Sequence, residues 1–114
     1  MIPYFASTDL ISKQETEYLE SLLPQGDFVE YDTKVTAHVD NTKWKRNTVL
    51  IVPLHYHKHY APCYFTTGPQ IHLSTPYLFN TQLEHYINNN KHDRYNFQIC
   101  FEEPIEEVAK CLTL

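Results

Sequence analysis

The sequence predicts a mainly β domain, a barrel or sandwich braced by one helix near each end of the chain. In the middle of the chain, short apolar or alternating runs are separated by turn residues, which is typical of all-β sandwiches and barrels. Helical periodicity occurs only near the two ends. A length of 114 residues is enough for one core but not for two. We therefore expect a single compact domain over residues 1–114.

Residues 2–5 form a short apolar segment near the start of the chain, and residues 10–23 predict the first helix. Ser12 and Glu15 have the spacing of a capping box, which begins a helix. An apolar stripe follows at helical spacing, formed by Ile11, Tyr18, Leu19, Leu22 and Leu23. Packing of this stripe against a sheet is the favoured interpretation, with a partner-binding helix as the alternative. The turn residues 24–27 end the helix.

Residues 28–40 and 47–54 predict two strands. The first alternates apolar and polar side chains, so that His38 and Asp40 share one face while Val39 lies on the other. The second contains the continuous apolar run 49–52, as expected for a strand covered on both faces. Trp44, between the strands, is either a packing residue or an aromatic side chain beside a substrate.

The segment 55–60 is rich in histidine. In a strand, His55, His57 and His59 would share one face and could bind zinc or copper. No cysteine or carboxylate at a suitable spacing completes such a site, so an exposed hairpin is the favoured interpretation.

Residues 79–97 predict two polar strands around an Asn-rich turn. Phe79, Thr81, Leu83 and His85 would share one face of the first strand. In the second strand, Tyr95, Phe97, Ile99 and Phe101 would pack beneath the N-terminal helix, and the polar side would line the barrel interior. A short last helix begins near Pro104, with a buried stripe of Ile105, Val108, Ala109 and Leu112.

His38, Asp40 and His85 are the candidate metal ligands. Two histidines and one carboxylate on neighbouring strands can cap one face of an octahedral iron and leave the other positions open. The alternative is that His38 and Asp40 are an exposed edge pair, hydrogen-bonded to each other.

The order of these residues resembles a known family. His38-x-Asp40, then His85, then Arg94 is similar to the Fe(II)/2-oxoglutarate-dependent dioxygenases. The segments Leu78-Phe79-Asn80-Thr81-Gln82-x-x-His85 and Asp93-Arg94-Tyr95 resemble small bacteriophage-type and aspartyl-hydroxylase-like members, and Ile2-Pro3-Tyr4-Phe5 resembles the entry to prolyl-hydroxylase-like members. A His-x-Asp pair alone is a weak signal, so the order and spacing carry the resemblance.

The resemblance implies a double-stranded β-helix, or jelly roll, and a reaction. His38, Asp40 and His85 would hold Fe(II), and Arg94 would bind the distal carboxylate of the cosubstrate 2-oxoglutarate with help from Asn96. Asn80 and Arg46 are weaker candidates. With O2, the enzyme would hydroxylate a peptidyl or free amino acid, while a nucleotide substrate also stays open. Because the segment before His38 is short, the barrel would be minimal, cut down from something larger or completed by a second subunit, as in a homo-oligomer.

Charge and cysteine content restrict the partners and the compartment. A formal net charge of −5 argues against nucleic-acid and anionic-membrane binding. The sequence contains no apolar leader and no apolar run long enough to span a membrane, and its three cysteines lack metal-binding spacing. These features predict reduced thiols in a cytoplasmic protein.

Two other function classes stay open, namely a non-catalytic jelly-roll binding module and a divalent-metal binder that uses the histidines of residues 55–60.

Overall fold

The computed structural model describes residues 4–23, 33–40, 46–54, 62–71, 73–90 and 95–112. Within these ranges the chain forms eight strands and two helices, so the mainly β prediction is confirmed. The strands are β1 (Phe5–Ser7), β2 (Thr33–His38), β3 (Thr48–Leu54), β4 (Cys63–Phe65), β5 (Gln70–Ile71), β6 (Tyr77–Asn80), β7 (His85–Asn90) and β8 (Tyr95–Phe101). The helices are α1 (Lys13–Ser21) and α2 (Ile105–Leu112).

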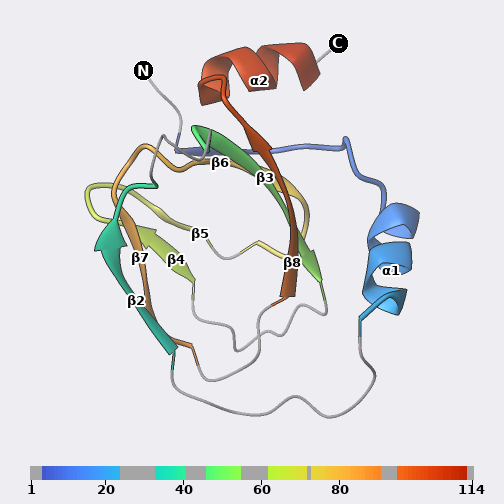
Figure 1. The fold of residues 1–114 in the computed structure, drawn as a ribbon, viewed down its shortest axis with the longest axis horizontal. Coiled ribbons are helices and arrows are strands. Elements are labelled where there is room, and N and C mark those ends of the chain that lie inside the picture. Colours follow the sequence, from blue (N-terminus) through green and yellow to red (C-terminus); the bar gives the residue numbers. More distant parts are fainter. Residues whose placement is uncertain are drawn as a thin grey trace.

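The strands are arranged in two antiparallel sheets (Figure 1). The first has the order β1-β6-β3-β8 and the second has the order β2-β7-β4-β5. Each strand lies in the sheet opposite to its predecessor, except at the β4–β5 hairpin. Around that hairpin β4 pairs with β5, β3 with β6 and β2 with β7. The chain therefore runs through β2, β3 and β4, reverses at the hairpin, and pairs β5, β6 and β7 with those three strands in reverse order.

Strand β3 is buried on both faces, as its apolar run predicts. Leu50, Val52 and Leu54 belong to a core cluster beneath the helices, which also includes Leu78 of β6. Ile51, on the opposite face, packs in a second cluster between the two sheets. The members of the second cluster come from both sheets and are Cys63, Phe65, Ile71, Tyr77 and Phe79.

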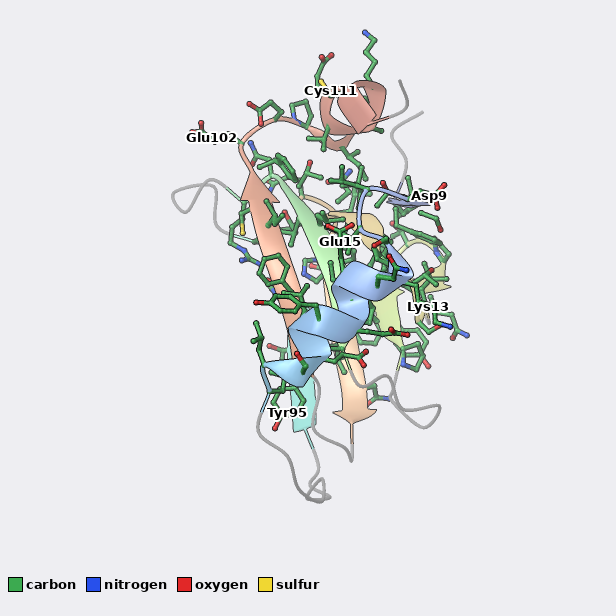
Figure 2. All side chains as sticks on the ribbon, turned by 90° about the vertical axis from the view of Figure 1, so that its right-hand side faces the viewer. Asp9, Lys13, Glu15, Tyr95, Glu102 and Cys111 are labelled. Atoms are coloured by element: carbon green, nitrogen blue, oxygen red, sulfur yellow. The ribbon has the colours of Figure 1, made fainter. Side chains whose placement is uncertain are left out.

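Helix α1 covers the outer face of the first sheet (Figure 2). Its predicted capping box is confirmed, because Ser12 Oγ accepts from the Glu15 amide and the Glu15 carboxylate accepts from the Ser12 amide. Ile11, Leu19 and Leu23 pack on the core, as expected. The prediction for Tyr18 and Leu22 is wrong: they are 65% and 64% exposed. These two, four residues apart, form a neighbouring row that the sheet leaves largely uncovered.

Most of the remaining apolar positions follow the predicted alternation. Tyr95, Ile99 and Phe101 of β8 pack on the same core as α1. The prediction that Phe97 packs there is wrong, since Phe97 is 39% exposed. Helix α2 lies over the end of the molecule next to β6 (Figure 1) and buries Ile105 and Val108. The predicted N-terminal helix on the sheet and short C-terminal helix are therefore both present.

The predicted strand that runs from Phe79 through His85 is wrong. Strand β6 ends at Asn80 in one sheet, and β7 begins at His85 in the other. A tight turn joins them, because Asn80 Oδ1 accepts from the Gln82 amide and the Asn80 carbonyl accepts from the Leu83 amide. The Asn-rich turn is also misplaced, since the asparagines 88–90 belong to β7.

Several expectations concern segments outside the described ranges. They include the predicted strand start at residues 28–32, Trp44, the histidines of residues 55–60, and Arg94. Cys63, Cys100 and Cys111 are all free thiols. In the part of the chain that the structure describes, neither helix has the length and apolar character needed to cross a membrane.

Candidate metal centre

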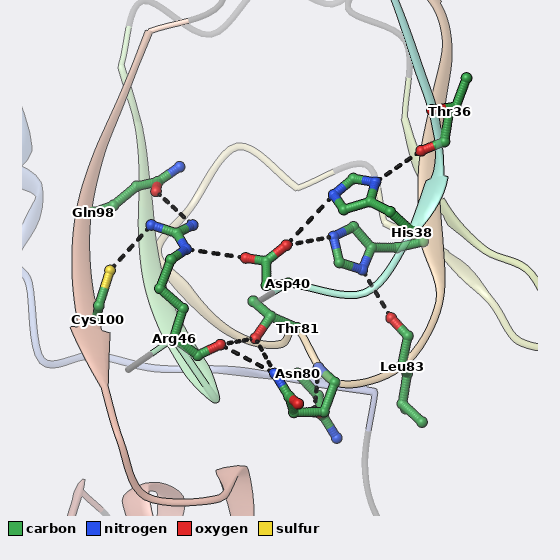
Figure 3. A network of polar contacts seen from close by, with 11 residues as sticks. Thr36, His38, Asp40, Arg46, Asn80, Thr81, Leu83, Gln98 and Cys100 are labelled. Carbon is green, nitrogen blue, oxygen red and sulfur yellow. Dashed lines mark hydrogen bonds and ion pairs between the residues drawn. The ribbon is translucent and has the colours of Figure 1, made fainter. Parts of the chain in front are cut away.

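His38, Asp40 and His85 come together at one end of the second sheet (Figure 3). His38 is the last residue of β2, His85 is the first residue of β7, and the two are partners in the antiparallel ladder. One side-chain ligand atom from each of the three residues lies within 4.8 Å of the others. The three candidate ligands predicted from the sequence are thus brought to one point.

Asp40 reaches this point although it lies beyond the end of β2. Its amide donates to the Thr81 carbonyl at 3.0 Å, which ties it to the turn between β6 and β7. Val39 is 52% exposed and points away. Asp40 Oδ1 lies 3.4 Å from Nε2 of His38 and 3.4 Å from Nε2 of His85. A single carboxylate oxygen therefore faces both imidazoles.

Backbone carbonyls orient both imidazole rings. His38 Nδ1 lies 2.7 Å from the Thr36 carbonyl oxygen, and His85 Nδ1 lies 2.8 Å from that of Leu83. A carbonyl oxygen can only accept, so each Nδ1 carries the proton and donates it. In the neutral ring Nε2 then carries the lone pair, and metal-binding histidines are held in this way.

His85 is the most buried member of the group. Its side chain is 9% exposed, and the Phe79 ring meets it edge-on with the centroids 4.8 Å apart. Burial lowers the pKa of His85, an effect that outweighs the bond to the Leu83 carbonyl, and the neighbouring His38 lowers it further. Near neutral pH the His85 ring is therefore neutral and able to bind a metal through Nε2.

The converging atoms form a set of acceptors. Two imidazole lone pairs and a carboxylate oxygen repel one another unless a proton or a cation lies between them. A separation of 3.4 Å exceeds the roughly 2.7–2.9 Å of a charge-assisted hydrogen bond. Two ligands in adjacent positions on one metal, each about 2 Å from it, lie about 3 Å apart. A cation held between these atoms would relieve the repulsion, and the group could hold a metal ion.

The group opens to solvent on one side. The His38 side chain is 41% exposed, against 14% for Asp40 and 9% for His85. The alternative interpretation of His38 and Asp40 as an exposed pair on their own is wrong, because Asp40 is largely buried and contacts His85 equally closely.

Arg46 connects the carboxylate to the first sheet, and the sequence marked it only as a weak candidate. Its Nε donates to Asp40 Oδ2 at 3.0 Å, Nη2 donates to Gln98 Oε1 at 3.2 Å, and Nη1 donates to Cys100 Sγ at 3.1 Å (Figure 3). Gln98 and Cys100 lie on the polar face of β8, which was expected to line the interior. Their contact with Arg46 was missed because it depends on the pairing of β8 with β3, the strand that follows Arg46.

The structure describes two of the three residues that were predicted to bind the cosubstrate. Asn96 shares the face of Gln98 on β8 and pairs with Pro53 of β3. Asn80 is 5% exposed, and its side-chain oxygen stabilises the turn after β6. Arg94 lies outside the described residues. The assignment of Arg94, Asn96 and Asn80 to 2-oxoglutarate binding stays a prediction.

A comparison of the chain with protein-family models, with curated proteins and with solved structures finds no match.

Proposed function

We propose that this protein is an Fe(II)- and 2-oxoglutarate-dependent oxygenase that hydroxylates a peptidyl or free amino acid. The observation that carries the proposal is the convergence of two imidazole Nε2 atoms on one oxygen of Asp40, with both Nδ1 atoms bonded to carbonyls. Two histidines and one carboxylate on one side of a metal, with the other positions open, are typical of non-haem Fe(II) oxygenases.

The proposed fold is the double-stranded β-helix, and the strand arrangement supports it. Alternation of successive strands between two sheets, and the nested pairs around the β4–β5 hairpin, are the pattern expected for a jelly roll. In this fold β2 and β7 are neighbours, so the ends of these two strands place His38 and His85 together.

The fit of iron to the centre follows from its donors. Imidazole nitrogen and carboxylate oxygen suit Fe(II), and no thiolate is among the three ligands. His38 and His85 would bind through Nε2 and Asp40 through Oδ1. When bound, the iron supplies the redox chemistry that couples loss of CO2 from 2-oxoglutarate to insertion of oxygen into a C–H bond. The products balance as succinate, CO2 and the hydroxylated substrate, with one O2 consumed.

The protein's own residues position the reactants and cover one side of the centre. The carbonyls of Thr36 and Leu83 hold the two rings in the metal-binding tautomer. The Phe65 and Phe79 rings cover His85 from the side of the interior. Arg94 would receive the distal carboxylate of 2-oxoglutarate through two parallel hydrogen bonds, and Asn96 would add a third.

Succinate formation tests the proposal. Purified protein with Fe(II), 2-oxoglutarate and O2 is expected to form succinate slowly alone and faster with the correct peptide or amino acid, whose mass increases by one oxygen atom. The Asp40→Ala variant is expected to form none. A folded protein that binds iron and yet makes no succinate with any peptide or amino acid would favour a non-catalytic jelly-roll module.

A further inference from the structure

The two oxygens of the Asp40 carboxylate face different partners. Oδ1 lies 3.4 Å from each imidazole Nε2, while Oδ2 accepts from Arg46 Nε at 3.0 Å. The carboxylate is 14% exposed, so little water competes for Oδ2. Only one of its oxygens is turned toward the point where the three ligands meet.

The Arg46 guanidinium is itself held at three points. In addition to Asp40, it donates to Gln98 Oε1 at 3.2 Å and to Cys100 Sγ at 3.1 Å on β8. A planar guanidinium with all three nitrogens engaged has a fixed orientation. Rotation of the Asp40 carboxylate would break the Nε contact without offering Arg46 another acidic partner among these contacts.

Thr81 fixes the main chains of both residues. Its hydroxyl donates to the Arg46 carbonyl and its carbonyl accepts from the Asp40 amide at 3.0 Å. Thr81 is 1% exposed. The two residues are thus linked twice, once through their side chains and once through this buried threonine.

We infer that Arg46 is a positioning residue that restricts Asp40 to a single-oxygen ligand and thereby keeps one more coordination position open. This inference rests on the proposed metal centre. In an octahedral ion, two imidazoles and one carboxylate oxygen leave three positions. If Oδ2 also bound, only two would remain. Since 2-oxoglutarate needs two positions for chelation, no position would then be left for O2.

A partly exposed ion pair contributes little to the stability of a protein, and the Arg46 side chain is 32% exposed. A purely structural Arg46 would therefore affect stability slightly and the metal not at all. The number of water molecules bound to the metal separates the two roles, because a structural ion pair does not change it.

The test uses Mn(II) as the probe, with water-proton relaxation to count the waters on the bound ion. Wild type is expected to hold about three exchangeable waters and Arg46→Met about two, so that the relaxation due to bound water falls by about one third. Lys13→Met removes one positive charge from α1, far from the centre, and is expected to behave as wild type. Thermal unfolding of each variant confirms that it is folded.

A second variant covers the case in which Arg46→Met does not fold. The double variant Gln98→Leu/Cys100→Ala keeps Arg46 but removes the two contacts that orient it, and it is expected to shift the water count in the same direction. An unchanged water count in a folded variant, with Mn(II) bound as in wild type, would overturn the role of Arg46. Failure of wild type to bind Mn(II) or Fe(II) at all would overturn the proposed function itself.

Discussion

His38 and His85 are partners in the antiparallel ladder of β2 and β7, with ring centroids 4.5 Å apart. Side chains opposite each other in such a ladder have Cβ atoms about 4.5–5.5 Å apart. Backbone pairing therefore places the two candidate ligands before any metal binds. The third ligand joins them from the loop after β2, where Thr81 holds the Asp40 amide.

Removal of either histidine should weaken metal binding strongly. Loss of outer-shell partners alone typically costs about 10–100-fold in affinity, so His38→Ala and His85→Ala should each cost at least about 100-fold. Calorimetric titration with Fe(II) under anaerobic conditions or with Co(II) measures this.

The matched control removes three histidines elsewhere. The triple variant His55→Gln/His57→Gln/His59→Gln should keep wild-type affinity and iron-dependent turnover. The opposite pattern, in which the triple variant loses the metal and the two alanine variants keep it, would favour the divalent-metal binder that uses these residues.

The burial of His85 predicts how stability depends on pH in the absence of metal. Its pKa is lowered in the folded protein, so the unfolded chain takes up the proton more readily. The free energy of unfolding should therefore fall as the pH drops below about 6.5, the ordinary histidine value. This loss should end once the pH is below the folded pKa. Urea unfolding of wild type and His85→Gln, with chelator present, measures it. If the two proteins lose stability in parallel, His85 does not contribute as described.

Arg94 should act on 2-oxoglutarate and not on iron. Hydrogen bonds to charged groups contribute about 1.5–3 kcal/mol each, so loss of two in Arg94→Met should weaken 2-oxoglutarate binding by roughly two orders of magnitude or more. Fe(II) affinity without cosubstrate should be unchanged. Separate titrations of the metal and of 2-oxoglutarate provide both values. A 2-oxoglutarate affinity within a factor of about three of wild type would show that the arginine has another role.

Gly68 has a steric role that can be tested by unfolding. A methyl group at this position would overlap the ring of Tyr4. That ring packs on Phe65 with centroids 4.8 Å apart, and its hydroxyl donates to the Thr67 carbonyl at 3.1 Å. Gly68→Ala should therefore destabilise the protein modestly, by less than the about 1–3 kcal/mol that overpacking of a closed core costs, because the Tyr4 ring must move aside.

The double-mutant cycle isolates this contact. In the Tyr4→Ala background, where the ring is absent, Gly68→Ala should cost much less, and chemical denaturation measures the difference. An equal cost in both backgrounds would place the cause in the backbone of the turn and not in Tyr4.

Local signals predicted the elements that rest on local physics. The capping box of Ser12 and Glu15 is followed directly by α1, which begins at Lys13. The continuous apolar run 49–52 lies in β3, which is buried on both faces. The alternation in β8 separated Ile99, beneath α1, from Gln98, which faces Arg46. In these cases the pattern of side chains and the pattern of burial have the same period.

Where tertiary contacts override local preference, the sequence could not predict the outcome. Asparagine is depleted in strands, yet residues 88–90 belong to β7, and Asn90 pairs with Thr33 of β2. The turn after Asn80 was missed because the alternation of apolar and polar side chains continues through it by chance.

The candidate ligands were predictable from their residue types and order. Their supporting contacts were not, since Arg46, just before β3, meets Cys100 only because β3 pairs with β8 in the first sheet. The pairing of distant strands is what places these side chains together.

The most direct test of the metal centre is an anaerobic titration with Fe(II) and 2-oxoglutarate, followed by visible absorption. Chelation of iron by 2-oxoglutarate gives a weak charge-transfer band that neither component gives alone. Wild type is expected to develop the band with saturation at one iron per chain, and Asp40→Ala is expected to develop none. The absence of both the band and Fe(II) binding in folded wild-type protein would contradict the assignment of His38, Asp40 and His85 as ligands.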